Sequence, residues 1–287
     1  MKPIKSLIIL LLIAVTSYSC TSDSNSSEND FTDLEASVKF NVSYGDNEFQ
    51  TYDLYLPENR DVDTKTLILV HGGGWTSGDK SDMDAFVELI QNDLPDVAIL
   101  NMNYRLVDNA TEAYPTQIND ISSVVNHLNA NLETYQISSD FGFIGTSAGA
   151  HLALLWSYAF NDLNQAKMVC SIVGPTNFTD PEYIEQIDSE ELQALIELYG
   201  LDLTTTFLEQ VSPYLQVTED APATILFYGG KDPLVPASQG SDLQDKLEAL
   251  GVMHEYTLYP EEGHGWDGLE LLDTWSKLKR FITENLD

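Results

Sequence analysis

The segment Gly145-Thr146-Ser147-Ala148-Gly149 has the residue types and spacing of a serine nucleophile. It follows a short apolar run that predicts a buried strand and precedes an Ala- and Leu-rich run that predicts a helix. A serine between two glycines at a strand-to-helix turn is the nucleophile elbow pattern. The glycines fit a turn where strand and helix nearly touch. The Ser147 hydroxyl is then pushed over the end of the sheet, at a helix N-terminus that favours developing negative charge.

A serine hydroxyl is a weak nucleophile at neutral pH, so it needs a base and a group that orients the base. Asp232 and His264 supply these types, and each follows a predicted strand, 223–228 and 254–259. The carboxyl ends of parallel strands meet at one edge of a sheet, where ligands bind in open α/β folds. We therefore predict that Ser147, Asp232 and His264 form a catalytic triad. Other acidic residues lie near His264 in the sequence, but Asp232 has the better position at a strand end.

The sequence His71-Gly72-Gly73-Gly74-Trp75 follows another predicted strand, 66–70. Three adjacent glycines let the backbone curl so that its N–H groups face a reacting carbonyl, although a plain glycine turn is the alternative. An oxyanion hole needs such donors. We predict that the donors are the backbone N–H groups of Gly73, Gly74 and Ala148.

Several polar and aromatic residues beside these motifs have less specific interpretations. Trp75 and Tyr104 are candidate substrate-binding residues, and core packing explains them equally well. His151, one turn into the elbow helix, and His71, at the start of the glycine loop, are expected to be structural. Asp120, in the helix after Pro115, is a candidate for tying down a neighbouring loop.

Buried strands alternate with amphipathic helices along most of the chain. The predicted strands span 38–44, 49–56, 66–70, 97–102, 141–144, 168–173, 223–228 and 254–259. The predicted helices span 83–93, 115–132, 148–158, 242–250 and 268–284. This alternation predicts an α/β fold whose mostly parallel sheet of about eight strands is covered by helices on both faces. The first two strands form an antiparallel hairpin at its edge.

Four motifs in this order resemble the α/β-hydrolase superfamily. They are His71-Gly72-Gly73-Gly74-Trp75, Asn103-Tyr104-Arg105-Leu106, the segment Gly145–His151, and Tyr228-Gly229-Gly230-Lys231-Asp232-Pro233. The chain is most similar to hormone-sensitive-lipase-like carboxylesterases and to bacterial acetyl and feruloyl esterases of the BD-FAE type. The resemblance covers residues 38–287. It implies an α/β-hydrolase fold and serine-dependent hydrolysis of a small-molecule or carbohydrate ester, without metal or cofactor.

Two other functions fit the same residues. A peptidase or formamidase uses the same triad on an amide, and only leaving-group protonation and pocket shape differ. A binding module could keep the fold and lose catalysis, but such a protein usually lacks the serine or the histidine, and here all three triad candidates are present.

The first residues resemble a bacterial lipoprotein signal peptide. Lys2 and Lys5 precede the apolar run 7–15, which is too short to span a bilayer as a mature helix, and small residues lead to Cys20. We expect residues 1–19 to be removed and Cys20 to be lipidated, with an ordinary secretory signal as the alternative. The protein is then exported to the bacterial outer membrane or cell surface, or else periplasmic or secreted.

The rest of the chain divides by composition. Residues 20–36 are rich in Ser, Asn, Asp and Glu and predict a flexible tether. Residues 37–287 form the predicted catalytic domain. Within it, residues 174–212 interrupt the alternation, and the predicted helix 182–199 makes this a small cap insertion or a surface helical insertion.

The formal net charge is −33 at pH 7, from 46 acidic and 13 basic residues. Such a chain is repelled by nucleic acids and by anionic membrane surfaces. We therefore expect no nucleic-acid partner, and membrane contact only through lipidated Cys20. Cys170 lies in an apolar run and is expected to be a packed thiol rather than a disulfide partner of Cys20.

Overall fold

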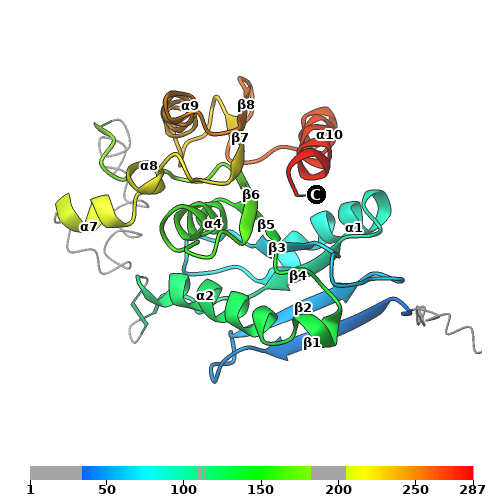
Figure 1. The fold of residues 1–287 in the computed structure, drawn as a ribbon. Coiled ribbons are helices and arrows are strands. Elements are labelled where there is room, and N and C mark those ends of the chain that lie inside the picture. The colour runs from blue at the N-terminus through cyan, green and yellow to red at the C-terminus, as the bar shows by residue number, and fades with distance from the viewer. Residues whose placement is uncertain (1–33, 109–110, 113, 182–204, 287) are drawn as a thin grey trace, which may run out of the picture. The chain divides into compact units, whose positions relative to one another are not determined.

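The computed structural model describes residues 34–108, 111–112, 114–181 and 205–286 (Figure 1). The described residues belong to one compact unit, Asp33–Asp287, to which the following description refers. The predicted signal peptide, Cys20, most of the predicted tether and the predicted helix 182–199 lie outside the described residues.

An eight-stranded sheet runs through this unit in the order β1-β2-β4-β3-β5-β6-β7-β8. The strands are β1 (Ser37–Ser43), β2 (Thr51–Leu56), β3 (Thr66–Val70), β4 (Ala98–Met102), β5 (Phe141–Thr146), β6 (Ala166–Ile172), β7 (Ala223–Gly229) and β8 (His254–Tyr259). β1 pairs antiparallel with β2, and β2 pairs antiparallel with β4. All later pairs are parallel, so the predicted mostly parallel sheet with an antiparallel hairpin at its edge is confirmed.

Helices cover both faces of this sheet. They are the 3-10 helix η1 (Lys80–Met83) and the α-helices α1 (Asp84–Asp93), α2 (Thr116–Asn129), α3 (Leu132–Tyr135), α4 (Ala148–Ala159), α7 (Thr205–Gln210), α8 (Pro213–Gln216), α9 (Ser238–Leu250) and α10 (Gly268–Asn285). Helices α2, α4 and α9 lie on one face, and α1 and α10 on the other (Figure 1). None of the described helices is long and apolar enough to cross a bilayer.

Three predicted elements differ from the structure by two or more residues at their starts: β2, α9 and β6, which begins at Ala166 rather than residue 168. β2 begins at Thr51 rather than residue 49, because Gln50 still belongs to the hairpin turn and its N–H donates to the Asn47 carbonyl. α9 begins one turn earlier than predicted, at Ser238, although its first residues are polar. Gln239 in that turn is buried, and its side-chain oxygen accepts the backbone N–H of Thr176 at 2.8 Å. Tertiary hydrogen bonds therefore stabilise a helical turn without apolar periodicity.

Helix α4 is the element that carries the predicted nucleophile. All residues from Ala148 to Ser157 are buried, because the helix packs on β5 and β6 and is flanked by α2 and α8. A helix that is apolar on all sides is expected for such a central position. Cys170, in neighbouring β6, is also fully buried as a free thiol. The N-terminus of α4 is thereby fixed at the carboxyl edge of the parallel strands.

Candidate active site

The turn between β5 and α4 has the sharp geometry of a nucleophile elbow. Ser147 adopts φ 51° and ψ −120°, a conformation that L-residues rarely take. A Cβ atom on Gly145 would lie 2.5 Å from the Gly149 carbonyl oxygen, so strand and helix do approach closely here. A Cβ atom on Gly149 would lie 2.2 Å from the Val70 carbonyl oxygen, so this second close approach is to the neighbouring strand β3.

Substituting Gly149 tests how tightly the elbow is packed. Gly149→Ala is expected to destabilise the fold by about 2 kcal/mol or more, because the added methyl group meets backbone rather than a movable side chain. Gly265→Ala is the matched control, since a Cβ atom added there would have no heavy atom within 4 Å. Urea denaturation of both variants measures the difference. Equal stability of the two variants would show that the elbow is not closely packed against β3.

Ser147, His264 and Asp232 are joined by two hydrogen bonds. The Ser147 Oγ atom lies 2.8 Å from His264 Nε2, and His264 Nδ1 lies 2.7 Å from Asp232 Oδ2. The other carboxylate oxygen of Asp232 accepts the N–H groups of Leu234 at 2.8 Å and Val235 at 3.0 Å. The Asp232 side chain is fully buried, whereas that of His264 is 23% exposed. This arrangement can pass the hydroxyl proton to the imidazole while the buried carboxylate orients the ring.

The loops after β7 and β8 hold Asp232 and His264 side by side because they pack against each other without intervening side chains. The N–H of Gly230 donates to the Tyr259 carbonyl at 2.8 Å, and the N–H of Lys231 donates to the Glu262 carbonyl at 2.8 Å. A Cβ atom on Gly229 would lie 2.1 Å from the Gly263 carbonyl oxygen. We predicted no role for Gly229 and Gly230 from the sequence. The two adjacent glycines were the signal that could have indicated this close contact between the loops.

The loop after β3 presents free backbone N–H groups. Gly73, Gly74 and Trp75 have successive positive φ angles of 108°, 57° and 63°. The Gly73 carbonyl accepts the N–H groups of Thr76 at 3.2 Å and Ser77 at 3.0 Å, which closes the turn. In the described part of the chain, the N–H groups of Gly73, Gly74 and Ala148 donate to no protein acceptor. They are available to a ligand, as oxyanion donors must be.

Trp75 is held behind this loop rather than in front of it. Its backbone carbonyl accepts the Gln117 side-chain amide at 3.0 Å and the Val107 N–H at 2.9 Å. Its indole N–H donates to His151 Nδ1 at 3.2 Å, and the residue is only 7% exposed. The structure therefore assigns Trp75 to anchoring the loop, and little of its surface is left for the substrate contact that we predicted.

Tyr104 is also packed under the loop instead of facing a ligand. It is fully buried, and its hydroxyl donates to the His71 carbonyl at 3.0 Å. Its ring stacks on the His71 imidazole with centroids 4.3 Å apart. His71 Nδ1 donates to the Gly72 carbonyl at 2.7 Å, and burial lowers the pKa of His71. His71 thus has the structural role that we expected, whereas Tyr104 offers no exposed surface to a substrate.

Comparison with known proteins identifies the family. Residues 52–247, more than half of the chain, match the BD-FAE family model. The chain belongs to the BD-FAE family. Esterase LipC of Mycobacterium tuberculosis is 27% identical over 250 residues, which cover 80% of this chain and 60% of LipC. This BD-FAE family member thus spans less than two thirds of that relative's length.

Solved esterase structures share the fold of this BD-FAE family member. Carboxyl esterase 2 of the mycorrhizal fungus Tuber melanosporum superimposes with a TM-score of 0.72 at 20% identity, covering 88% of this chain and 89% of that enzyme. A truncated carbohydrate esterase from gut microbiota superimposes with a TM-score of 0.69 at 20% identity, covering 88% of this chain and 97% of that protein. These similarities confirm the predicted α/β-hydrolase fold.

Asp120 ties the loop after β4 to helix α2. Its fully buried carboxylate accepts the Arg105 guanidinium at 2.6 Å and 3.0 Å, the Arg105 backbone N–H at 2.9 Å and the Gln50 amide at 2.9 Å. The hydrogen bonds that Arg105 donates to Asp120 raise the pKa of Arg105. The loop held in this way continues to Val107, whose N–H donates to the Trp75 carbonyl. The Asp120 contacts therefore also support the loop after β3 that carries Gly73 and Gly74, which we call the oxyanion loop.

Removing this buried carboxylate should strongly destabilise the BD-FAE domain. Asp120→Ala is expected to lower the free energy of unfolding by about 3 kcal/mol, because it leaves the Gln50 amide without its acceptor and the Arg105 guanidinium with only the Thr116 carbonyl, at 3.4 Å. Asp162→Ala, at an exposed position, is the control and should change stability by less than about 0.5 kcal/mol. Chemical denaturation measures both, and a wild-type midpoint for Asp120→Ala would contradict the structural role.

The stability of the domain should also depend on the protonation of His151. Burial lowers the pKa of His151 from 6.5 to about 4, so the unfolded chain binds a proton more readily than the folded one. Above pH 6.5, His151 is neutral in both states and does not reduce the free energy of unfolding. As the pH drops from 6.5 towards 4, the unfolded chain gains a proton at His151 that the folded protein does not bind, so the free energy of unfolding falls. This loss of unfolding free energy is on the order of 3 kcal/mol at pH 4. We expect wild type to lose more unfolding free energy than His151→Gln between pH 7.5 and 4; equal losses would contradict this assignment.

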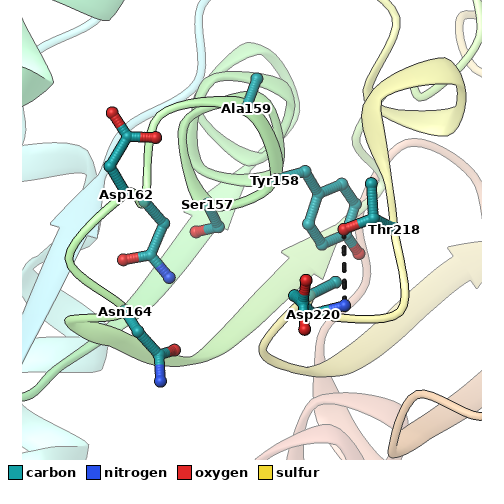
Figure 2. A pocket seen from close by; sticks show the side chains of 9 residues that line it. Ser157, Tyr158, Ala159, Asp162, Asn164, Thr218 and Asp220 are labelled. Atoms are coloured by element: carbon teal, nitrogen blue, oxygen red, sulfur yellow. Dashed lines mark hydrogen bonds between the residues drawn. The ribbon is translucent and has the colours of Figure 1, made fainter.

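A separate pocket lies at the C-terminal end of α4 (Figure 2). Its volume is about 410 Å³, and its lining residues are Ser157, Tyr158, Ala159, Asn161, Asp162, Asn164, Thr218, Asp220 and Ala221. Ser157 is ten residues after Ser147, which corresponds to about 15 Å along a helix. This pocket is therefore distinct from the site formed by Ser147, His264 and Asp232.

Proposed function

We propose that this BD-FAE family member is a serine carboxylesterase that hydrolyses carboxylic esters through an acyl-enzyme. The observation that carries the proposal is the unbroken pair of hydrogen bonds from Ser147 through His264 to Asp232, at 2.8 Å and 2.7 Å. Free N–H groups beside the serine and similarity to named esterases support it.

The first step is the transfer of the acyl group to Ser147. His264 Nε2 takes the hydroxyl proton as Ser147 Oγ bonds to the ester carbonyl carbon, and the carbonyl oxygen becomes an oxyanion. The N–H groups of Gly73, Gly74 and Ala148 donate to that oxyanion. When the tetrahedral intermediate collapses, the bond to the alcohol oxygen breaks, and the imidazolium returns its proton to the departing alcohol.

In the second step, water hydrolyses the acyl-enzyme with His264 again acting as base and then as acid. His264 Nε2 accepts a proton from water as the water oxygen attacks the acyl carbon, and the proton then returns to Ser147 Oγ as the acid leaves. Throughout, Asp232 keeps the Nδ1 proton of His264 in place and stabilises the positive imidazolium. Because Asp232 is held by two backbone N–H groups, it does not have to reorganise during the reaction.

The substrate class that we propose is a carboxylic ester of a carbohydrate, with acetyl or feruloyl groups as the candidates. The fold shared with a carbohydrate esterase supports this choice. The net charge of −33 further favours neutral over anionic substrates.

A panel of matched substrates tests the proposal. It contains 4-nitrophenyl acetate, butyrate and octanoate, methyl ferulate, acetylated xylan, and 4-nitroacetanilide as the amide counterpart of the acetate. We expect the acetate to be cleaved much faster than its amide, and acetylated xylan or methyl ferulate to be turned over. Faster cleavage of the amide would instead favour a peptidase or formamidase, and no cleavage of any substrate would favour a binding module.

A further inference from the structure

His151 connects the helix that carries the nucleophile to two other parts of the domain. It lies one turn after Ser147 in α4 and is 2% exposed. Its Nε2 atom lies 2.7 Å from the Val211 carbonyl oxygen, between α7 and α8, and its Nδ1 atom accepts the Trp75 indole N–H at 3.2 Å. A carbonyl oxygen can only accept, so Nε2 carries the proton and Nδ1 is left with the lone pair that the indole requires. Both bonds are therefore satisfied by one neutral tautomer.

Aromatic rings fix the orientation of this imidazole. The Trp75 ring meets it edge-on with centroids 5.3 Å apart, and the Phe178 ring meets it edge-on with centroids 5.1 Å apart. The position of Phe178 is fixed in turn, because its N–H donates to Ser212 Oγ at 2.9 Å. The imidazole thus cannot rotate without losing packing as well as hydrogen bonds.

The backbone of Trp75 needs such support. A φ angle of 63° is unfavourable for a bulky residue, and a conformation of this kind costs on the order of 1–2 kcal/mol unless its surroundings hold it. Gln117 and Val107 hold its carbonyl oxygen, and His151 holds its side chain. Trp75 directly follows Gly73 and Gly74, so its position sets the direction of their free N–H groups.

We infer that His151 is a positioning residue that fixes the oxyanion loop relative to Ser147. The inference rests on the proposed function, because it assigns His151 to the donors of that reaction. The His151 N–H donates to the Ser147 carbonyl at 3.1 Å, within the same helical turn. Ser147 and His151, which holds the oxyanion loop through Trp75, are therefore parts of one rigid helical turn. An apolar residue could fill the same volume, but it would hold Trp75 in no particular direction.

Steady-state kinetics of four variants test the inference. His151→Phe keeps an aromatic ring, slightly larger than the imidazole, and removes both hydrogen bonds, and Trp75→Phe removes the indole donor together with one of its two rings. We expect each to lower kcat by about 10- to 100-fold with KM within about twofold, because oxyanion donors act mainly on the transition state. His151→Asn, which keeps an acceptor near the Nδ1 position, should recover part of the loss. The double variant His151→Phe/Trp75→Phe should be no worse than the poorer single one, because both remove the same contact.

Amide hydrogen exchange of the segment 72–78 provides a readout that does not require catalysis. Exchange there should be faster in His151→Phe and Trp75→Phe than in wild type, and unchanged in Ser147→Ala. A wild-type kcat in both variants would overturn the inference. So would unchanged exchange at 72–78 with only a lower global stability, because that is the result of a core-packing role. If wild type cleaves no ester, the proposed function fails, and the exchange data still decide whether His151 holds the loop.

Discussion

Ser147→Ala should abolish ester hydrolysis, leaving about 10⁻⁴ or less of the wild-type kcat/KM, while the fold remains intact. The substitution removes only the Ser147 hydroxyl group. In the structure, this hydroxyl is hydrogen-bonded to His264 Nε2 at 2.8 Å. Alanine meets the same backbone strain as serine at φ 51°, so the elbow does not gain or lose from the exchange. Hydrolysis of 4-nitrophenyl acetate and a thermal unfolding curve measure the two properties.

Ser157→Ala is the matched control, since Ser157 lies in the same helix and is also buried. Its Oγ atom has no hydrogen-bond partner in the described structure, so removing it should leave activity unchanged and stability equal or slightly higher. Retention of substantial activity by Ser147→Ala, with normal behaviour of Ser157→Ala, would exclude Ser147 as the nucleophile.

Asp232→Asn should lower kcat by about 10⁴-fold with little loss of stability. The amide oxygen can still accept the N–H groups of Leu234 and Val235, so the loop is retained. The amide nitrogen then faces His264 Nδ1 as a donor, in place of the Oδ2 atom that lies there at 2.7 Å. His264 must accept at Nδ1 and carry its proton on Nε2, which prevents it from taking the proton of Ser147.

Glu261→Gln and Glu262→Gln are the controls for this prediction, because both residues are close to His264 in the sequence. Glu261 is exposed and pairs with Lys231, and the Glu262 carbonyl that accepts the Lys231 N–H is unchanged by its substitution. We expect both to keep kcat within about twofold of wild type, as surface substitutions usually do. A large loss in either one, with an active Asp232→Asn, would transfer the orienting role to that glutamate.

Much of the fold and the meeting of the three side chains could be predicted from the sequence, because the relevant signals are local. Apolar runs between turn residues marked the strands to within about two residues, and the spacing of glycines marked the elbow and the donor loop. Asp232 and His264 each follow a strand by a few residues, so the parallel topology alone brings them to the edge that holds Ser147.

The supporting contacts could not be predicted, because they join segments far apart in the chain. Trp75 and His151 are 76 residues apart, and His151 and Val211 are 60 apart, with no periodic pattern linking them. The burial of Tyr104 could not be predicted either. Tyrosine has both an apolar ring and a polar hydroxyl, so it occurs in pockets as well as in cores. Only the fold decides that this hydroxyl binds a loop carbonyl instead of a ligand.

Covalent labelling followed by peptide mass spectrometry tests the central claim most directly. Wild-type protein treated with a fluorophosphonate should gain one adduct per chain, located on Ser147. Labelling should be absent in Ser147→Ala, slowed by orders of magnitude in Asp232→Asn and unchanged in Ser157→Ala. An adduct on another residue, or equal labelling of wild type and Ser147→Ala, would contradict a mechanism in which His264 and Asp232 activate this serine.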